Sequence, residues 1–211
     1  MNNKLYSKVF LWMFLGLLVT FATGVYTSTN VDALSVIFSK GGYIVLAILE
    51  LVVVIFLSAR ITKMSPTTAK VCFLLYSFLT GLTFSSIFIV YKVSSIIAVF
   101  GVTSLLFLIF AAIGKYTKLD LTKLVTYLFM GLIGVLVLSI VSIFVPALNL
   151  GVAILGLIIF LGYVAYDMQM IQRRIDMMDE ENLSIYCAFQ LYIDFINIFL
   201  DLLRIFGDSR D

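Results

Sequence analysis

The sequence contains no histidine, so metal sites and proton switches built on imidazole are excluded. Charged residues are also scarce, at 12% of the 211 residues, which is about half the share of a soluble domain. The formal net charge is only +2 and gives no reason to expect a nucleic acid partner. Cysteine occurs twice, at Cys72 and Cys187, with neither metal-ligand spacing nor a disulfide framework. Proton chemistry near neutral pH is therefore left to carboxyl groups.

Hydrophobic residues, by contrast, make up 63% of the chain. A folded interior of this size cannot hide so much apolar surface from water, so lipid must cover the excess. We predict an all-α integral membrane protein with one seven-helix transmembrane domain over residues 1–211. Seven stretches are long enough to span a bilayer: 9–26, 43–59, 71–91, 96–113, 124–145, 151–169 and 185–206. The first resembles a signal peptide, but no small-x-small cleavage site leads into a soluble segment, so we expect no cleavage.

The distribution of lysine and arginine predicts the orientation, because cytoplasmic loops carry an excess of both. A cytoplasmic N-terminus puts ten of the fourteen basic residues inside: Lys4, Lys8, Arg60, Lys63, Lys70, Lys115, Lys118, Lys123, Arg173 and Arg174. The other side receives Lys40, Lys92, Arg204 and Arg210. Seven spans then place the C-terminus outside, and the short loops favour a multi-pass protein of a bacterial plasma membrane.

The last span carries the longest series of polar residues. Gln190, Asp194, Asn197, Asp201 and Arg204 follow one another at intervals of 4, 3, 4 and 3 residues. This spacing places them on one helical face. A polar stripe of this length cannot face lipid, so we predict a central last helix. The alternative is an amphipathic helix lying on the membrane surface, although such helices usually carry Lys and Arg on their polar face.

Two acids are expected at similar depth in the last two spans. Asp167 lies six residues before Arg173, and Asp194 lies ten residues after Ser184. At 1.5 Å per residue, these positions are roughly 9 and 15 Å from the inner surface. Two close carboxyl groups in a poorly hydrated site cannot both ionise cheaply, so they would share a proton and sense pH. Two separately paired structural acids are the alternative.

The second span adds one acid and one base. Glu50 lies at mid-bilayer depth, where a lone carboxylate indicates a cation path. Arg60 ends the span, about 15 Å from Glu50 along the helix. Its side chain can extend to the lipid headgroups or turn inward to the acids.

These residues form a pattern that resembles the transmembrane Bax inhibitor motif family, the Bax inhibitor-1-like proteins. Four stretches carry the resemblance: Glu50–Ser65 (ELVVVIFLSARITKMS), Phe73–Ile87 (FLLYSFLTGLTFSSI), Ala165–Ile171 (AYDMQMI) and Leu191–Gly207 (LYIDFINIFLDLLRIFG). Two positions depart from the family pattern: Met168 stands where threonine is usual, and Asp201 stands where an apolar or aromatic residue is expected.

The resemblance implies a last helix surrounded by the other six and a pH-sensitive calcium leak. The aspartate pair of the family's pH sensor falls on Asp167 and Asp194, and its arginine latch falls on Arg60. Glu50 matches the family's acidic position in the second span. With Asp167 and Asp194, it would contact calcium transiently.

We therefore expect a passive calcium-permeable channel gated by protonation, with calcium, protons and membrane lipid as partners and no cofactor. Three alternatives remain open: a proton-coupled cation transporter, an intramembrane aspartyl protease using Asp167 and Asp194, and a non-conducting regulatory scaffold. The protease requires a Gly-x-Gly-Asp segment, which neither acid has, so we expect no enzyme activity. The sequence names no protein partner.

Overall fold

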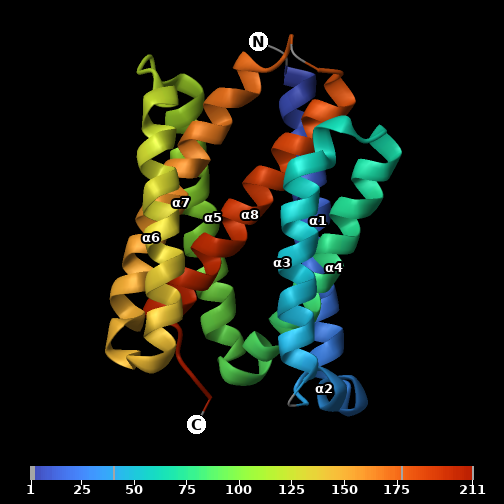
Figure 1. Ribbon diagram of the computed structural model, residues 1–211, viewed down its shortest axis with the longest axis vertical. Coiled ribbons are helices and arrows are strands. Elements are labelled where there is room, and N and C mark those ends of the chain that lie inside the picture. The colour runs from blue at the N-terminus through green and yellow to red at the C-terminus, as the bar shows by residue number, and fades with distance from the viewer. Residues whose placement is uncertain (1–2, 40, 177, 211) are drawn as a thin grey trace. The chain divides into compact units, whose positions relative to one another are not determined.

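A computed structural model describes residues 3–39, 41–176 and 178–210 of the chain. Lys40, which the charge argument assigned to the external side, lies outside these residues. The described residues form helices and no β-strand (Figure 1). The α-helices are α1 (Asn3–Ser28), α2 (Val31–Ile37), α3 (Gly42–Arg60), α4 (Pro66–Val90), α5 (Val93–Tyr116), α6 (Leu124–Phe144), α7 (Asn149–Arg173) and α8 (Glu180–Phe206). Three short 3-10 helices join them: η1 (Ile61–Lys63), η2 (Leu121–Lys123) and η3 (Pro146–Leu148).

Seven of the helices are long and apolar enough to cross a membrane, which confirms the predicted all-α membrane fold. Several extend beyond the predicted spans because polar residues continue the helix at its ends. The seven-residue helix α2 was not predicted. Its start is capped by the Asn30 side chain, which accepts a hydrogen bond from the Ala33 N–H at 3.1 Å.

The residues group into two units. The first unit comprises the described residues within 3–91 and 175–192 together with Arg210, and the second comprises residues 92–174 and 193–209. Neither unit is one continuous stretch of chain. Helix α8 contributes to both, because its residues up to Tyr192 belong to the first unit and those from Ile193 to the second.

In the first unit, α1 and α4 lie side by side, and α3 packs on α4 (Figure 1). The contact between α1 and α4 depends on glycine at position 81. A Cβ atom there would lie 2.7 Å from the carbonyl oxygen of Thr20, which is too close for any larger residue. Small residues at such positions let membrane helices approach closely.

In the second unit, α7 packs against both α5 and α6. A small core of Leu128, Val135, Val152 and Ile159 fills the space between α6 and α7. Helix α7 thereby has a fixed position within its unit, and it carries Asp167.

Helix α8 is the most buried span of the described chain. In its most apolar stretch, 72% of the residues are buried, against 50% for α4 and 11% for the span Leu121–Phe144. The prediction of a central last helix is therefore confirmed, and the surface-helix alternative is excluded.

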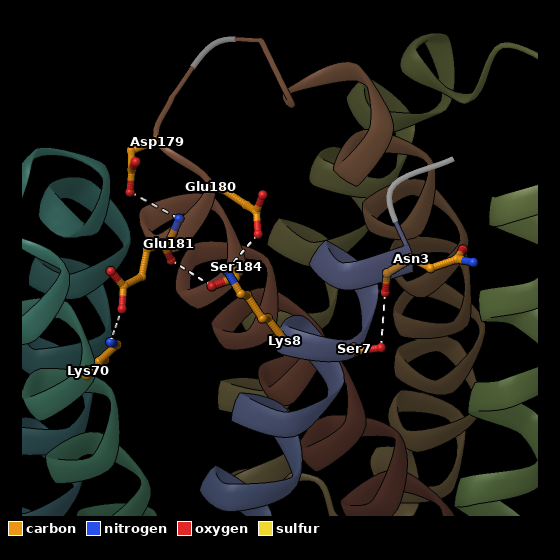
Figure 2. Close-up of polar contacts among 8 residues, drawn as sticks. All are labelled: Asn3, Ser7, Lys8, Lys70, Asp179, Glu180, Glu181 and Ser184. Atoms are coloured by element: carbon orange, nitrogen blue, oxygen red, sulfur yellow. Dashed lines mark hydrogen bonds and ion pairs between the residues drawn. The ribbon is translucent and has the colours of Figure 1, made fainter.

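The start of α8 is tied to the first unit by charged residues (Figure 2). Asp179 accepts a hydrogen bond from the Glu181 N–H at 3.1 Å and so caps the helix. Glu180 pairs with Lys8 of α1 at 2.6 Å, and Glu181 pairs with Lys70 of α4. Acids in the first turn also suit the helix dipole. Two helices of the first unit thereby hold the first turn of α8 in place.

Candidate functional site: a buried carboxyl pair

The second unit contains two buried acids on neighbouring helices. Asp167 lies near the C-terminal end of α7 with 8% of its surface exposed, and Asp194 lies in the middle of α8 with 4% exposed. The two carboxyl groups lie close enough for their charges to interact. The depth argument predicted this proximity.

Among the described residues, no donor of good geometry reaches the buried Oδ2 atom of Asp194. Two carboxylates cannot hydrogen-bond to each other, since both are acceptors only. A proton held between Asp167 and Asp194 would supply the missing donor. The arrangement can therefore hold one proton at a buried position.

Two further residues act on this pair, and sequence reasoning missed both. Arg174 is half-buried and lies close enough to Asp167 for their charges to interact. Tyr163 lies within electrostatic range of both Asp167 and Asp194. Helical spacing could have indicated both residues. Tyr163 precedes Asp167 by about one turn, and Arg174, directly after the end of α7, follows it by about two turns. Arg174 had been counted only as a cytoplasmic charge.

The connection before η2 is anchored to the same end of α7. The Gln169 amide donates to the Leu119 carbonyl oxygen at 2.8 Å, and Arg173 pairs with Asp120 at 2.8 Å. The Thr122 hydroxyl donates to Asp120 at 2.7 Å and, with the Thr122 N–H and Arg173, lowers the pKa of this exposed acid. A pocket opens here, lined by Gly114, Lys115, Thr117, Lys118, Leu119, Gln169, Gln172 and Arg173. This polar, basic pocket therefore lies near the same end of α7 as Asp167, because Gln169, which lines it, follows Asp167 by two residues.

Glu50 belongs to the first unit, where it is half-buried on α3. The Thr83 hydroxyl of α4 donates to Glu50 Oε2 at 2.8 Å. Tyr76 and Tyr192 lie within electrostatic range of the same carboxyl group. Glu50 is therefore an acid held by a hydroxyl, with two aromatic hydroxyl groups nearby.

A buried hydroxyl cluster connects α1, α4 and α8 in this unit. The Thr20 oxygen lies 3.0 Å from the carbonyl oxygens of both Gly16 and Ser77, and 2.6 Å from the Tyr192 hydroxyl. Thr20 has one proton, which points to a carbonyl oxygen, so Tyr192 donates to Thr20. Three helices are joined here without any buried charge.

Arg60 is the last residue of α3 and is exposed. It belongs to the first unit, whereas the carboxyl pair belongs to the second. The segment after Arg60 is connected to α8, because the Asn182 amide donates to the Met64 carbonyl oxygen at 3.4 Å. Arg60 is thus followed by a turn that contacts the first turns of α8.

The other polar residues of α8 differ in exposure. Gln190 and Asn197 are half-buried, Asp201 is buried and Arg204 is exposed. Within the described residues, no three acidic or cysteine side chains gather in a way that could hold a metal ion.

Comparison with known proteins identifies the family. The family model described as inhibitor of apoptosis-promoting Bax1 matches residues 2–211. The chain belongs to the Bax inhibitor motif family. This confirms the family that the sequence motifs indicated.

Several curated relatives of this Bax inhibitor family protein are bacterial. The inner membrane protein YbhL of Escherichia coli K12 is 42% identical over 97% of this chain and 91% of its own length. An uncharacterized protein of Borreliella burgdorferi is 38% identical over 100% of this chain and 94% of its own length. An uncharacterized protein of Deinococcus radiodurans is 35% identical over 97% of this chain and 90% of its own length. The Bax inhibitor family chain is a multi-pass membrane protein that matches these relatives over nearly their whole length.

Proposed function

We propose that this protein is a passive, pH-sensitive calcium leak channel in a bacterial plasma membrane. The observation that carries the proposal is the facing pair Asp167 and Asp194, buried in a chain with seven membrane-spanning helices. Ionisable groups are costly inside a membrane protein and usually serve transport or gating. Carboxylate oxygens also suit a hard divalent cation.

The proposed gate works through the charge of this pair. With both acids ionised, the site attracts a neighbouring guanidinium group most strongly, and an arginine stays charged at any physiological pH. Adding a proton weakens that attraction and releases the latch. The family resemblance assigns the latch to Arg60. Arg174, which already interacts with Asp167, is the competing counter-ion.

Glu50 is proposed as the acid of the cation path. The hydrogen bond from Thr83 keeps its carboxyl group oriented. A half-buried carboxylate of this kind attracts a divalent ion without a complete coordination cage, which suits brief contact rather than storage.

The test is calcium flux into liposomes that contain the purified protein and an internal calcium dye, measured across pH. We expect flux down the calcium gradient alone and a rise in flux as the pH falls from alkaline to mildly acidic. Flux that requires an opposing proton gradient would show a proton-coupled transporter instead. A folded protein that passes no calcium at any pH would favour the regulatory scaffold.

The proposed orientation has a cytoplasmic N-terminus and an external C-terminus, as the bias of Lys and Arg indicates. If all seven helices that are long and apolar enough to cross the membrane do so, the two ends lie on opposite sides. Reporter fusions at the two ends should report opposite compartments, with the N-terminal reporter inside. Reporters on the same side would contradict this orientation.

A further inference from the structure

The basic pocket of the second unit has no role in the proposed channel. It lies where α5 ends at Tyr116 and α7 ends at Arg173, and its volume is about 190 Å³. This volume is well above the roughly 30 Å³ that one molecule occupies in liquid water. The pocket therefore has room for a polar group of several atoms.

The charges that line the pocket are positive. Among the described residues around it, Lys115, Lys118 and Arg173 are basic and none is acidic. The ion pair with Asp120 at 2.8 Å neutralises Arg173. Lys118 is exposed, and Lys115 is half-buried with its ammonium group 5.4 Å from the centre of the Tyr116 ring. A contact with a ring does not cancel the charge of a lysine. The pocket thus keeps an excess of positive charge, which favours an anion.

The backbone on one side of the pocket is held in place. The Gln169 side chain uses both ends of its amide on the connection between α5 and α6. Its nitrogen donates to the Leu119 carbonyl oxygen at 2.8 Å, and its oxygen accepts from the Leu121 N–H at 2.9 Å. Figure 1 shows the end of α7 beside this connection. The segment that carries Lys118 is therefore fixed before a ligand arrives, which lowers the cost of binding.

The pocket lies at the level expected for the membrane surface. Both α5 and α7 are long and apolar enough to cross a membrane, and both end beside the pocket. Tyr116 is 68% exposed, and Leu119, which lines the pocket, is 72% exposed. Tyrosine is typical of the boundary between lipid headgroups and acyl chains. Cations beside exposed apolar side chains at this level fit a lipid better than a ligand dissolved in water.

We propose that this pocket binds the phosphate group of an anionic phospholipid. Lys115 and Lys118 would bring their ammonium groups to the phosphate oxygens. Tyr116 and Leu119 would contact the apolar part of the same lipid. Basic pockets between membrane-spanning helices bind anionic headgroups on the cytoplasmic side, which is the side that the proposed orientation gives this pocket. The inference goes beyond the proposed channel function and does not depend on it, because the carboxyl pair takes no part in lipid binding.

Native mass spectrometry of the full-length protein released from detergent provides the test. We expect the protein to retain phosphatidylglycerol in preference to phosphatidylcholine with the same acyl chains, because only phosphatidylglycerol has a net negative charge. The double variant Lys115→Gln, Lys118→Gln should weaken phosphatidylglycerol binding about twenty-five-fold, since each lysine near an anionic lipid contributes roughly fivefold. Phosphatidylcholine binding should not change. Equal retention of the two lipids by the wild type would overturn the proposal.

The matched control is the double variant Lys63→Gln, Lys123→Gln. Both lysines are exposed, lie outside the pocket lining and belong to the same predicted side of the membrane. The control therefore removes the same charge from the same side without touching the pocket. We expect it to bind phosphatidylglycerol as the wild type does. An equal loss of binding in both double variants would overturn the pocket in favour of general attraction to the basic surface.

Glycerol phosphate and inorganic phosphate separate a lipid from a dissolved phosphate compound. We expect neither to bind in equilibrium dialysis at millimolar concentration or to displace phosphatidylglycerol, because neither has an apolar part for Tyr116 and Leu119 to contact. If either compound binds, and Lys115→Gln, Lys118→Gln removes that binding while phosphatidylglycerol binding is unaffected, the pocket receives a soluble anion and the lipid proposal is wrong.

Discussion

Both units bury hydroxyl groups, but among the described residues only one of the two units buries acids. Every acid that is buried in the described chain belongs to the second unit: Asp167, Asp194 and Asp201. The buried polar side chains of the first unit are hydroxyls, such as Thr20 and Ser77, which bond to helix carbonyl oxygens. A hydroxyl satisfied by a carbonyl costs little inside a membrane protein, whereas a carboxyl group costs much. Under the proposed function, buried hydroxyl groups serve packing, whereas the buried carboxyl pair of the second unit serves proton chemistry.

The largest expected effect is on the pair itself. Asp194→Asn removes the shared proton site while keeping the shape of the side chain. The pH dependence of calcium flux, which we expect to be about tenfold for a proton-linked step worth about 1.4 kcal/mol, should disappear. Calcium flux in liposomes across pH provides the measurement, with Asp208→Asn as the control, because Asp208 is an exposed acid paired with Lys92. A variant that conducts with unchanged pH dependence would show that the second unit's acids are structural.

The arginine latch gives the next effect. Arg60→Ala should raise calcium flux at alkaline pH several-fold and flatten the pH response, because ionised acids would lose the cation that closes the gate. Arg174→Ala is the matched variant, since Arg174 interacts with Asp167 within the second unit. If only Arg174→Ala opens the channel at alkaline pH, the latch belongs to α7, and Arg60 is a surface residue.

Glu50 is the exception in the first unit, being an acid among hydroxyls. Glu50→Gln should lower calcium flux while leaving the fold intact, because a neutral amide attracts a divalent ion less than a carboxylate does. Thr83→Val, which removes the hydrogen bond to Glu50, should have a smaller effect. Calcium flux and circular dichroism of both variants provide the test. If both variants conduct calcium as fast as the wild type, Glu50 has only a packing role, like the hydroxyl residues around it.

The smallest effect tests the packing role of the hydroxyl cluster. Tyr192→Phe removes one buried hydrogen bond and should lower the free energy of unfolding by about 0.5–1.5 kcal/mol. The pH dependence of calcium flux should not change. Tyr26→Phe is the control, because Tyr26 is 71% exposed. Altered pH dependence in Tyr192→Phe would mean that the first unit also takes part in proton chemistry.

The seven spans and the buried last helix could be predicted because both depend on composition and period. An apolar run of about 20 residues is stable across the bilayer. A polar stripe on such a helix is stable only where it faces protein or a cavity, which predicts the buried position of α8. The facing of Asp167 and Asp194 followed from their depth in consecutive helices. Helix α2 could not be predicted, because seven residues are too few to show a helical period.

The surroundings of the acids could not be predicted, since they depend on how helices approach in three dimensions. Gly156 is one of several glycines within spans, and nothing in its spacing shows that Asp201 lies against it. From the sequence alone, the charge of Arg174 can either set the orientation in the membrane or pair with a buried acid. Only its half-buried position at the end of α7 points to the second.

Helix α8 runs unbroken from Glu180 to Phe206, although its two halves belong to different units. This continuity limits how the protein can change its length during evolution. One residue inserted between Tyr192 and Ile193 would rotate everything after it by about 100°. Asp194 would then turn away from Asp167, even though no amino acid had been replaced. Insertions and deletions are therefore expected in the connections between helices, while the length of α8 stays constant among relatives.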